Sequence, residues 1–194
     1  MLASISSELR RQQYATGRLL VKHILSQALN CQTADIDIWV DHNGKPYSSC
    51  PNAPEFSISH TKDYVVVAEA SVPVGVDYEH RKHTRNFLGI SEHYFSENEC
   101  KWIRNPYSTA QQEERFYHLW VLKEAHAKAT GRGLSDSLAL DYLATKPEGS
   151  KLTLGPNIQL YHSKHGRDFH LGLAAITQSP LQIEITNVAP ETIK

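Results

Sequence analysis

Two kinds of hydrophobic spacing alternate along the amino-terminal part of the chain. Over residues 4–30, apolar side chains such as Leu20 and Ile24 recur at three- and four-residue intervals with basic residues among them, which predicts a helix. Residues 35–41 and 56–59 instead alternate apolar and polar positions, and this period of two predicts half-buried strands. The chain therefore begins with a helix that is followed by strands.

Turn signals separate the predicted strands. Asn43-Gly44 predicts a hairpin turn, because both residues tolerate positive φ. Residues 46–54 are rich in Pro, Ser and Asn, which indicates a loop. Residues 64–70 are apolar enough for a fully buried strand, and a short turn separates them from another strand at residues 72–79.

Helix-start signals return beyond residue 81. Ser96 and Glu99 have the spacing of a capping box, in which a hydroxyl and a carboxylate satisfy each other's backbone amides. That helix is expected to end at Asn105-Pro106. Ser108 then opens the longest helix, which should run to about residue 130 and stop at Gly131.

The last third of the chain is strand-like, so the fold class predicted is α+β. The expected strands are residues 151–154, 157–161, 169–176 and 181–185. Both halves combine a helix with antiparallel strands, which predicts two similar lobes, residues 1–72 and 73–194, in one compact unit.

Composition narrows the possible functions. The 194 residues carry 20 Lys and Arg against 21 Asp and Glu, a formal net charge of −1. Proteins that bind nucleic acid normally carry a basic excess, so we expect no nucleic-acid partner. No segment has the ~20 successive apolar residues of a membrane span, and the start of the chain lacks the apolar core of a signal peptide. The three cysteines form no C-x-x-C pair, so we expect reduced thiols and a cytoplasmic protein.

Two carboxylates share one face of the strand at residues 72–79. Asp77 and Glu79 alternate with Val76 and Tyr78, and successive side chains on one face stand roughly 6.6 Å apart. Such a pair repels itself unless a cation intervenes, and carboxylate oxygens suit Mg²⁺. Gly75, on the same face, is expected to leave space for a ligand. The alternative is a strand that runs into solvent with hydrated carboxylates.

The longest helix carries a row of side chains one turn apart. Phe116 and Trp120 begin the row, and Glu124 and Lys128 continue it. Because the aromatic part should face the interior, the charged part needs a metal or a phosphate as partner. The alternative is an ordinary solvent-exposed ion pair.

Two segments carry side chains of the types that bind phosphate. Lys45 lies in the Gly-Lys-Pro turn, and Ser59 and His60 end the strand at residues 56–61. An ammonium, a hydroxyl and an imidazole are donors that can hold phosphates, although each is also common at a surface. His162 and His165 are a weak candidate for a transition-metal pair.

Four segments together resemble the 4′-phosphopantetheinyl transferase superfamily, of the single-chain type that activates surfactin synthetase and of the holo-acyl-carrier-protein synthases. They are Gly-Lys-Pro at 44–46, Phe-Ser-Ile-Ser-His at 56–60, Val-Gly-Val-Asp-Tyr-Glu at 74–79 and Trp-Val-Leu-Lys-Glu-Ala-x-x-Lys at 120–128. Phe95-Ser96-x-x-Glu99 and Gly131-x-Gly133-Leu134 also match similar residues of that family. The chain departs from the family in a short amino-terminal region, which predicts that an opening strand is missing, and in His126 at an apolar position.

The resemblance implies a pseudo-twofold fold with coenzyme A in the cleft between the lobes. It implies Mg²⁺ on Asp77, Glu79 and Glu124. The coenzyme-binding residues that it implies are Arg18, with Arg10 or Arg11, and Lys45, Ser59, His60, Asp77, Lys123 and Lys128. The catalytic residues that it implies are Asp77, Glu124 and Lys128.

The implied reaction transfers 4′-phosphopantetheine from coenzyme A to a serine of an apo acyl or peptidyl carrier protein and releases adenosine 3′,5′-bisphosphate. Mg²⁺ and Lys128 would stabilise the negative charge, and the base is Glu124 or a magnesium-bound water that it orients. The carrier protein would meet the basic cluster Arg81, Lys82 and Arg85. We expect a monomer. Alternatives are a metal-dependent nucleotide or coenzyme A phosphohydrolase and a non-catalytic module that binds coenzyme A or a carrier protein.

Overall fold

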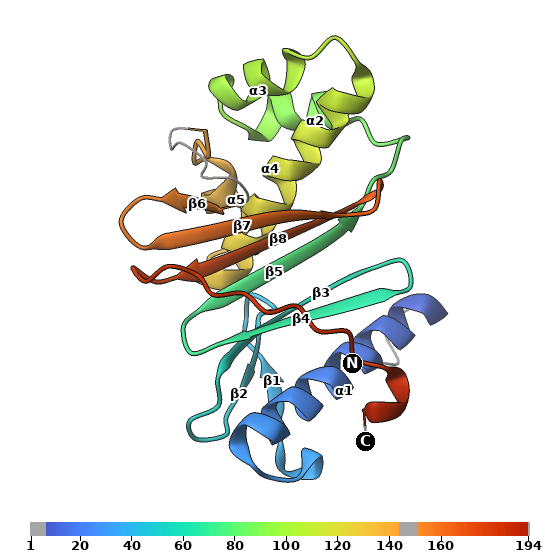
Figure 1. Ribbon diagram of the computed structural model, residues 1–194, viewed down its shortest axis with the longest axis vertical. Helices are drawn as coiled ribbons and strands as arrows, with labels where there is room; N and C mark the ends of the chain where they lie inside the picture. Colours follow the sequence, from blue (N-terminus) through green and yellow to red (C-terminus); the bar gives the residue numbers. More distant parts are fainter. Residues whose placement is uncertain (1–6, 144–150, 194) are drawn as a thin grey trace.

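Each half of the chain packs one 22-residue helix against antiparallel strands in the computed structural model, which describes residues 7–143 and 151–193 (Figure 1). The amino-terminal elements are α1 (Glu8–Leu29), the 3₁₀ helix η2 (Thr33–Asp35), β1 (Ile38–Val40), β2 (Pro46–Ser48), β3 (Glu55–Thr61) and β4 (Tyr64–Ala70). β1 pairs with β2 and β3 pairs with β4, both antiparallel. The predicted boundary between residues 72 and 73 falls in the turn that leads from β4 to β5.

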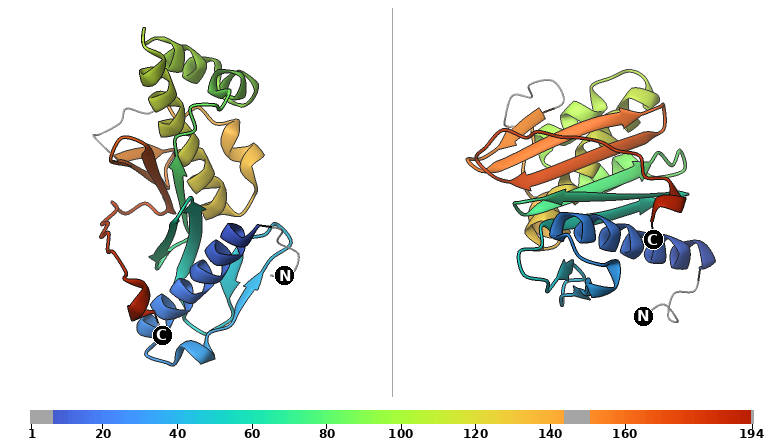
Figure 2. Two further views of the ribbon diagram at one scale, coloured as in Figure 1. Left: turned by 90° about the vertical axis from the view of Figure 1, so that its right-hand side faces the viewer. Right: turned by 60° about the horizontal axis from the view of Figure 1, so that its bottom comes forward.

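The carboxyl-terminal half contains a four-stranded antiparallel sheet in the order β5-β8-β7-β6. Its elements are β5 (Val74–His80), α2 (Phe87–Tyr94), α3 (Glu97–Arg104), α4 (Thr109–Thr130), α5 (Leu134–Leu138), β6 (Lys151–Leu154), β7 (Ile158–His165), β8 (Phe169–Ile176) and the 3₁₀ helix η3 (Pro190–Thr192). The helix α4 lies against one face of this sheet (Figure 2). The predicted α+β class with two lobes is confirmed.

The predicted helix ends are confirmed by their hydrogen bonds. The Ser96 hydroxyl accepts from the Glu99 amide and the Glu99 carboxylate accepts from the Ser96 amide, so the capping box forms. Ser108 accepts from the Gln111 amide at the start of α4. Gly131 ends α4 at φ +67°, a left-handed conformation that glycine adopts without steric cost.

Two glycines allow α4 to lie directly on the sheet. A Cβ at Gly75 would collide with the Ala125 carbonyl oxygen and the Ala129 amide, and one at Gly172 with the Val121 carbonyl. Gly172 is the cross-strand partner of Asp77. The expectation that Gly75 leaves space for a ligand is therefore wrong, because the backbone of α4 fills that space.

The two halves are joined by side chains of β3 that bond to the backbone of β5. The Ser57 hydroxyl accepts from the Val76 amide at 3.1 Å and the Ser59 hydroxyl from the Tyr78 amide at 3.0 Å. Thr61 continues the row by accepting from the His80 amide at 3.4 Å. Because strand side chains alternate, every second residue of β3 meets every second amide of β5. We call this row the hydroxyl ladder.

Three strand predictions are wrong in detail. Residues 181–185 form no strand; this segment leaves β8 and runs back towards α1 (Figure 1), and Ile185 is 56% exposed. Its alternating pattern found no strand partner, and a strand needs one for its backbone groups. Residues 46–48 form β2 where a loop was expected, because the hairpin pairs Pro46 with Val40. β4 is only partly buried, since Tyr64 is exposed at its start.

The hydroxyl ladder predicts a loss of stability in a Ser57→Ala variant. Without the hydroxyl, the buried Val76 amide has no acceptor, which costs about 1–3 kcal/mol of unfolding free energy. Urea unfolding measures this loss. Ser71→Ala, at an exposed serine, is the control and should stay within about 0.5 kcal/mol of the parent protein. Equal stabilities of the two variants would contradict the ladder.

Candidate functional site

Asp77 is the centre of the candidate site. Its carboxylate is buried, and its Oδ1 atom accepts from the Lys128 ammonium at 2.7 Å and from the Ser59 hydroxyl at 3.0 Å. The Lys128 ammonium also donates to the Val76 carbonyl at 3.1 Å. The structure thus joins three predicted site residues from β3, β5 and α4.

Glu79 and Glu124 lie near Asp77 in an environment that disfavours their charge. Burial, and then the Asp77 charge, raises the pKa of Glu79, while Arg85 opposes the rise. Burial, and then the Asp77 charge, raises the pKa of Glu124 to about 7. The three predicted ligands therefore repel one another, as carboxylates that share one site do.

The three carboxylates are chemically suited to bind a hard cation, and one oxygen atom of Asp77 supports a cation at this position. Asp77 Oδ2 is buried and has no hydrogen-bond partner among the described residues. Oxygen atoms from carboxylates are the ligands that Mg²⁺ prefers. In the described parts of the chain, however, no group of three His, Cys, Asp or Glu residues is arranged as a finished metal site. Here the Lys128 ammonium lies against Asp77 instead.

The predicted phosphate-binding residues surround the Lys128 end of this cluster. His60 is exposed to solvent on one side; partial desolvation of its ring on the other side, and then the positive charges of Lys128 and Arg10, lower its pKa. Lys45 reaches the other lobe, where its ammonium donates to the Ala129 carbonyl at 3.0 Å. Asn43 of the same turn donates to the Gly131 carbonyl, so this hairpin is docked on the end of α4.

The arginines of α1 differ in their surroundings. Arg10 is close enough to His60 to affect its pKa, whereas Arg11 forms an ion pair with Glu8 at 2.7 Å. Arg18 lies over the Tyr14 ring and donates to the Ile38 carbonyl at 2.9 Å. Of the two arginines that the sequence left open, Arg10 is thus the one beside the predicted phosphate-binding residues.

Lys123 does not fit its predicted role in binding the coenzyme. Its side chain is 0% exposed and forms an ion pair at 3.0 Å with Glu99, which is also 0% exposed. It donates to the carbonyls of Leu138 and Leu140 as well. Lys123 lies in the interior because one turn of α4 sends successive side chains to different sides, so it belongs to the core.

Two of the three basic residues expected to meet a carrier protein are largely withdrawn from the surface. Arg81 is buried and forms an ion pair at 2.7 Å with the buried Glu113. Arg85 is half-buried against aromatic rings of α4 and lies 3.7 Å from Glu79. Lys82 alone is exposed. The expected basic surface is therefore reduced to one residue, and Arg85 joins the candidate site, a position that the sequence spacing did not reveal.

A row of three imidazoles, of which His170 is buried and His118 and His162 are half-buried, replaces the predicted histidine pair. His162 Nδ1 lies 3.0 Å from His118 Nδ1, and His162 Nε2 lies 3.0 Å from His170 Nδ1. His165 is instead next to the Tyr78 hydroxyl. Burial lowers the pKa of His118 and of His170 to about 4 and, with the two neighbouring imidazoles, that of His162 to about 2. The row is neutral at physiological pH.

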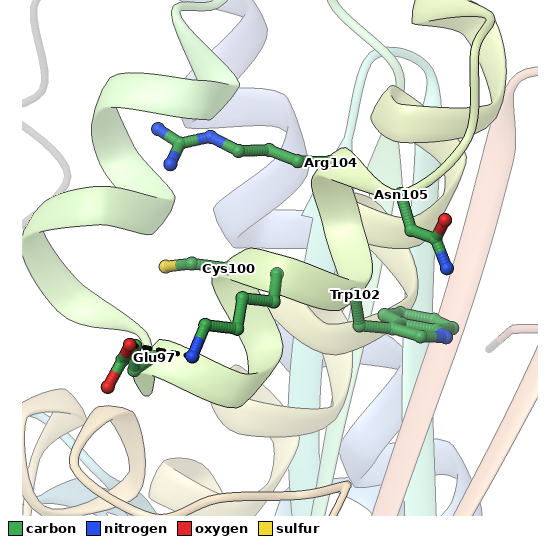
Figure 3. A pocket seen from close by; sticks show the side chains of 6 residues that line it. Glu97, Cys100, Trp102, Arg104 and Asn105 are labelled. Carbon is green, nitrogen blue, oxygen red and sulfur yellow. Dashed lines mark ion pairs between the residues drawn. The ribbon is translucent and has the colours of Figure 1, made fainter.

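Two cavities lie away from the carboxylates. One, of about 630 Å³, lies along α3 and is lined by Cys100, Trp102 and other residues of that helix (Figure 3). The other, of about 820 Å³, lies between α4 and the strands β6 and β7 and is lined in part by His118 and His162. Neither is lined by Asp77, Glu79 or Glu124.

His126, the departure from the family pattern within α4, is buried and lies 2.7 Å from the Tyr142 hydroxyl. Burial lowers the pKa of His126, so the neutral ring forms a local hydrogen bond in the core.

Two family models match the chain. The model of the 4′-phosphopantetheinyl transferase superfamily matches residues 73–174, and the model of the amino-terminal part of 4′-phosphopantetheinyl transferases matches residues 8–72. The chain belongs to the 4′-phosphopantetheinyl transferase superfamily.

Curated relatives carry the same family name. The 4′-phosphopantetheinyl transferase ffp of Bacillus subtilis is 38% identical over 131 residues, which cover 67% of this chain and 56% of the relative. Psf-1 of Bacillus pumilus is 34% identical, over 71% of this chain and 58% of the relative. Sfp of Bacillus subtilis strain 168 is 33% identical, over 67% and 56%. The chain thus spans less than two thirds of the length of these relatives.

The burial of Lys123 predicts that a Lys123→Met variant loses stability. Removal of the Lys123 ammonium would leave Glu99 as an unpaired charge in the interior, which costs about 3–5 kcal/mol of unfolding free energy. Lys101→Met, which removes the exposed ion pair with Glu97, is the control and should cost less than about 0.5 kcal/mol. Denaturant unfolding compares them. A stable Lys123→Met protein with weakened coenzyme binding would restore the role predicted from sequence.

The imidazole row predicts that the protein loses stability in acid. The unfolded chain binds protons at these histidines below about pH 6.5, whereas the folded chain does so only near pH 4 or lower. Each of these histidines thus contributes fully above pH 6.5, and its contribution falls by at most about 1.4 kcal/mol per pH unit as the pH drops towards 4. Unfolding free energies measured from pH 7 to 4 should fall less steeply for His162→Gln; parallel curves would contradict the assignment.

Proposed function

We propose that this chain transfers the 4′-phosphopantetheine group of coenzyme A to a serine hydroxyl of an apo acyl or peptidyl carrier protein and releases adenosine 3′,5′-bisphosphate. Membership of the superfamily and the names of the relatives support this reaction class. The observation that carries the proposal is the cluster of Asp77, Glu79, Glu124 and Lys128, which joins β5 to α4.

Mg²⁺ would be held by Asp77, Glu79 and Glu124. The unpartnered Asp77 Oδ2 atom and the mutual repulsion of the carboxylates support a cation at this position. When bound, Mg²⁺ supplies positive charge that stabilises the oxygens of the pyrophosphate as they become more negative.

The chain's own cations would hold the phosphates of the coenzyme. Lys128 is adjacent to Asp77 and 31% exposed, so its ammonium can turn from the carboxylate to a pyrophosphate oxygen. Lys45 and His60 follow on the side of the amino-terminal lobe, with Arg10 and Arg18 beyond them for the nucleotide. Ser59 would act through Asp77, because its buried hydroxyl donates to that carboxylate.

Glu124 is our candidate for the group that accepts the proton of the serine. It makes no hydrogen bond or ion pair within the described part of the chain, so its carboxylate is free to accept this proton directly or to orient a water molecule that accepts it.

We propose that the protein acts in the cytoplasm. It would be a monomer, with the boundary between its two lobes near residue 72. All three cysteines are free, which suits a reducing compartment. Among the described residues, the helices are too short or too polar to cross a bilayer.

Intact-mass analysis tests the proposed reaction. The protein is incubated with apo carrier protein, coenzyme A and Mg²⁺. A transferase adds the phosphopantetheine mass to the carrier, a phosphohydrolase consumes coenzyme A without modifying it, and a binding module does neither. If neither an acyl nor a peptidyl carrier protein gains the phosphopantetheine mass, the proposal is overturned.

A Glu124→Gln variant should keep its fold and lose transfer activity. Removing a general base typically costs a factor of about 10² to 10⁴ in kcat. Glu114→Gln, on the same helix, removes an ion pair with Lys164 far from the carboxylates and should keep its activity. Steady-state transfer rates compare the two variants, and full turnover by Glu124→Gln would remove Glu124 from the mechanism.

A further inference from the structure

Arg85 is a second cation fixed at the carboxylate cluster. Its guanidinium lies 5.3 Å from the centre of the Trp120 ring and 5.6 Å from that of Tyr117, so two aromatic side chains of α4 hold it in place. Its Nη2 atom lies 3.7 Å from Glu79 Oε1, and its side chain is 20% exposed. The position of Arg85 is thus set by α4 and by Glu79 together.

The carboxylates and their cations form an ordered arrangement. Lys128 lies against Asp77 at one end and Arg85 against Glu79 at the other. Glu124 has neither a hydrogen bond nor an ion pair in the part of the chain that the structure describes. The positive charges of Lys128 and Arg85 both act to lower the pKa of Glu79 and of Glu124. Each cation therefore interacts electrostatically with more than its own ion-pair partner.

A divalent cation that approaches this cluster alone meets two positive charges that already neutralise two of the three carboxylates. An anionic ligand changes this balance, because its phosphates attract the same ammonium and guanidinium groups. When Lys128 turns to a phosphate oxygen and the negative charge of the phosphates offsets the charge of the fixed Arg85, the carboxylates become available to the metal. Coulomb energies between partly buried charges a few ångströms apart are large enough to control such an exchange.

We propose that Arg85 and Lys128 are internal counterions that keep the affinity for free divalent metal low and couple metal binding to binding of the coenzyme. The proposal rests on the proposed function, since it takes Asp77, Glu79 and Glu124 as the metal ligands. It assigns Arg85 a role through Glu79, and so Arg85 is a positioning residue. Lys128 would itself meet the coenzyme, which makes Arg85 the better residue for a test.

Binding of Mn²⁺, followed by electron paramagnetic resonance of the free ion, measures the coupling without turnover. The parent protein should bind Mn²⁺ weakly alone and at least about tenfold more tightly with coenzyme A. Pantetheine, which has no phosphates, should not strengthen binding. The Arg85→Met variant, which keeps an aliphatic side chain against Trp120, should bind Mn²⁺ alone about tenfold more tightly and gain less from coenzyme A.

Two further variants separate charge from packing. Arg85→Lys keeps the positive charge and should bind Mn²⁺ as the parent protein does. Arg115→Met removes an arginine that lies over Trp102, 4.7 Å from its ring centre and away from the carboxylates, and should leave Mn²⁺ binding unchanged. Thermal unfolding checks that each variant is folded, and Arg85→Gln replaces Arg85→Met if the latter is not.

The outcomes separate this inference from the proposed function. Unchanged or weaker Mn²⁺ binding by the charge-removing Arg85 variant overturns the counterion role, and a weaker one would make Arg85 a support that orients Glu79. Absence of Mn²⁺ binding by the parent protein even with coenzyme A overturns the metal site of the proposed function. Transfer to a carrier protein, measured separately by mass, decides the reaction itself.

Discussion

The hydroxyl ladder between β3 and β5 is the constraint on which the rest of the structure depends. Ser57, Ser59 and Thr61 accept hydrogen bonds from alternate amides of β5, so the amino-terminal lobe is joined to an edge strand of the other lobe's sheet without a regular backbone ladder. Ser59 has a second function, because the hydroxyl that accepts from the Tyr78 amide also donates to Asp77. The contact that joins the lobes therefore also fixes the central carboxylate, and stability and site geometry cannot vary independently.

The helix α4 is held on two sides. On the sheet side, the absence of a Cβ at Gly75 and Gly172 lets its backbone lie against β5 and β8, which brings Glu124 and Lys128 to the carboxylates of β5. On the other side, Lys123 is buried with Glu99, and this pair ties α4 to α3 and to the segment around residue 140. A buried ion pair stabilises little by itself but penalises any other arrangement of the helix, because a displaced partner would leave a bare charge in the core. Such rigidity suits a site that must hold three like charges close together.

Charged residues of the same type differ in their burial and in their ion-pair partners. The formal net charge of −1 conceals a cluster in which, among the residues that the structure describes, Asp77 and Glu79 each form an ion pair with one cation and Glu124 forms none. Lys123 sits on the same helix as Lys128, five residues away, but is buried as a structural ion pair, whereas Lys128 is partly exposed beside Asp77. The imidazole row is different again, since its three neutral rings, of which only His170 is fully buried, lie against one another between α4 and the sheet. Residues of the same type thus lie in the candidate site, in a structural ion pair or in a stack of rings, according to the side of the helix on which they stand.

The sequence alone determined the local structure and the grouping of the chemistry. Capping residues defined α3 and α4, alternation placed Asp77 and Glu79 on one face of β5, and the motifs indicated the family, because these signals depend on neighbours a few positions apart. The sequence did not decide which side chains are exposed. Gly75 was expected to leave space for a ligand, and the backbone of α4 fills that space. Lys123 was expected at the coenzyme and lies in the core, and Arg81 was expected at a surface and is buried. Residues 181–185 alternate like a strand but pair with no strand in the described part of the chain. Each of these outcomes depends on contacts between distant segments, and only the tertiary structure brings those segments together.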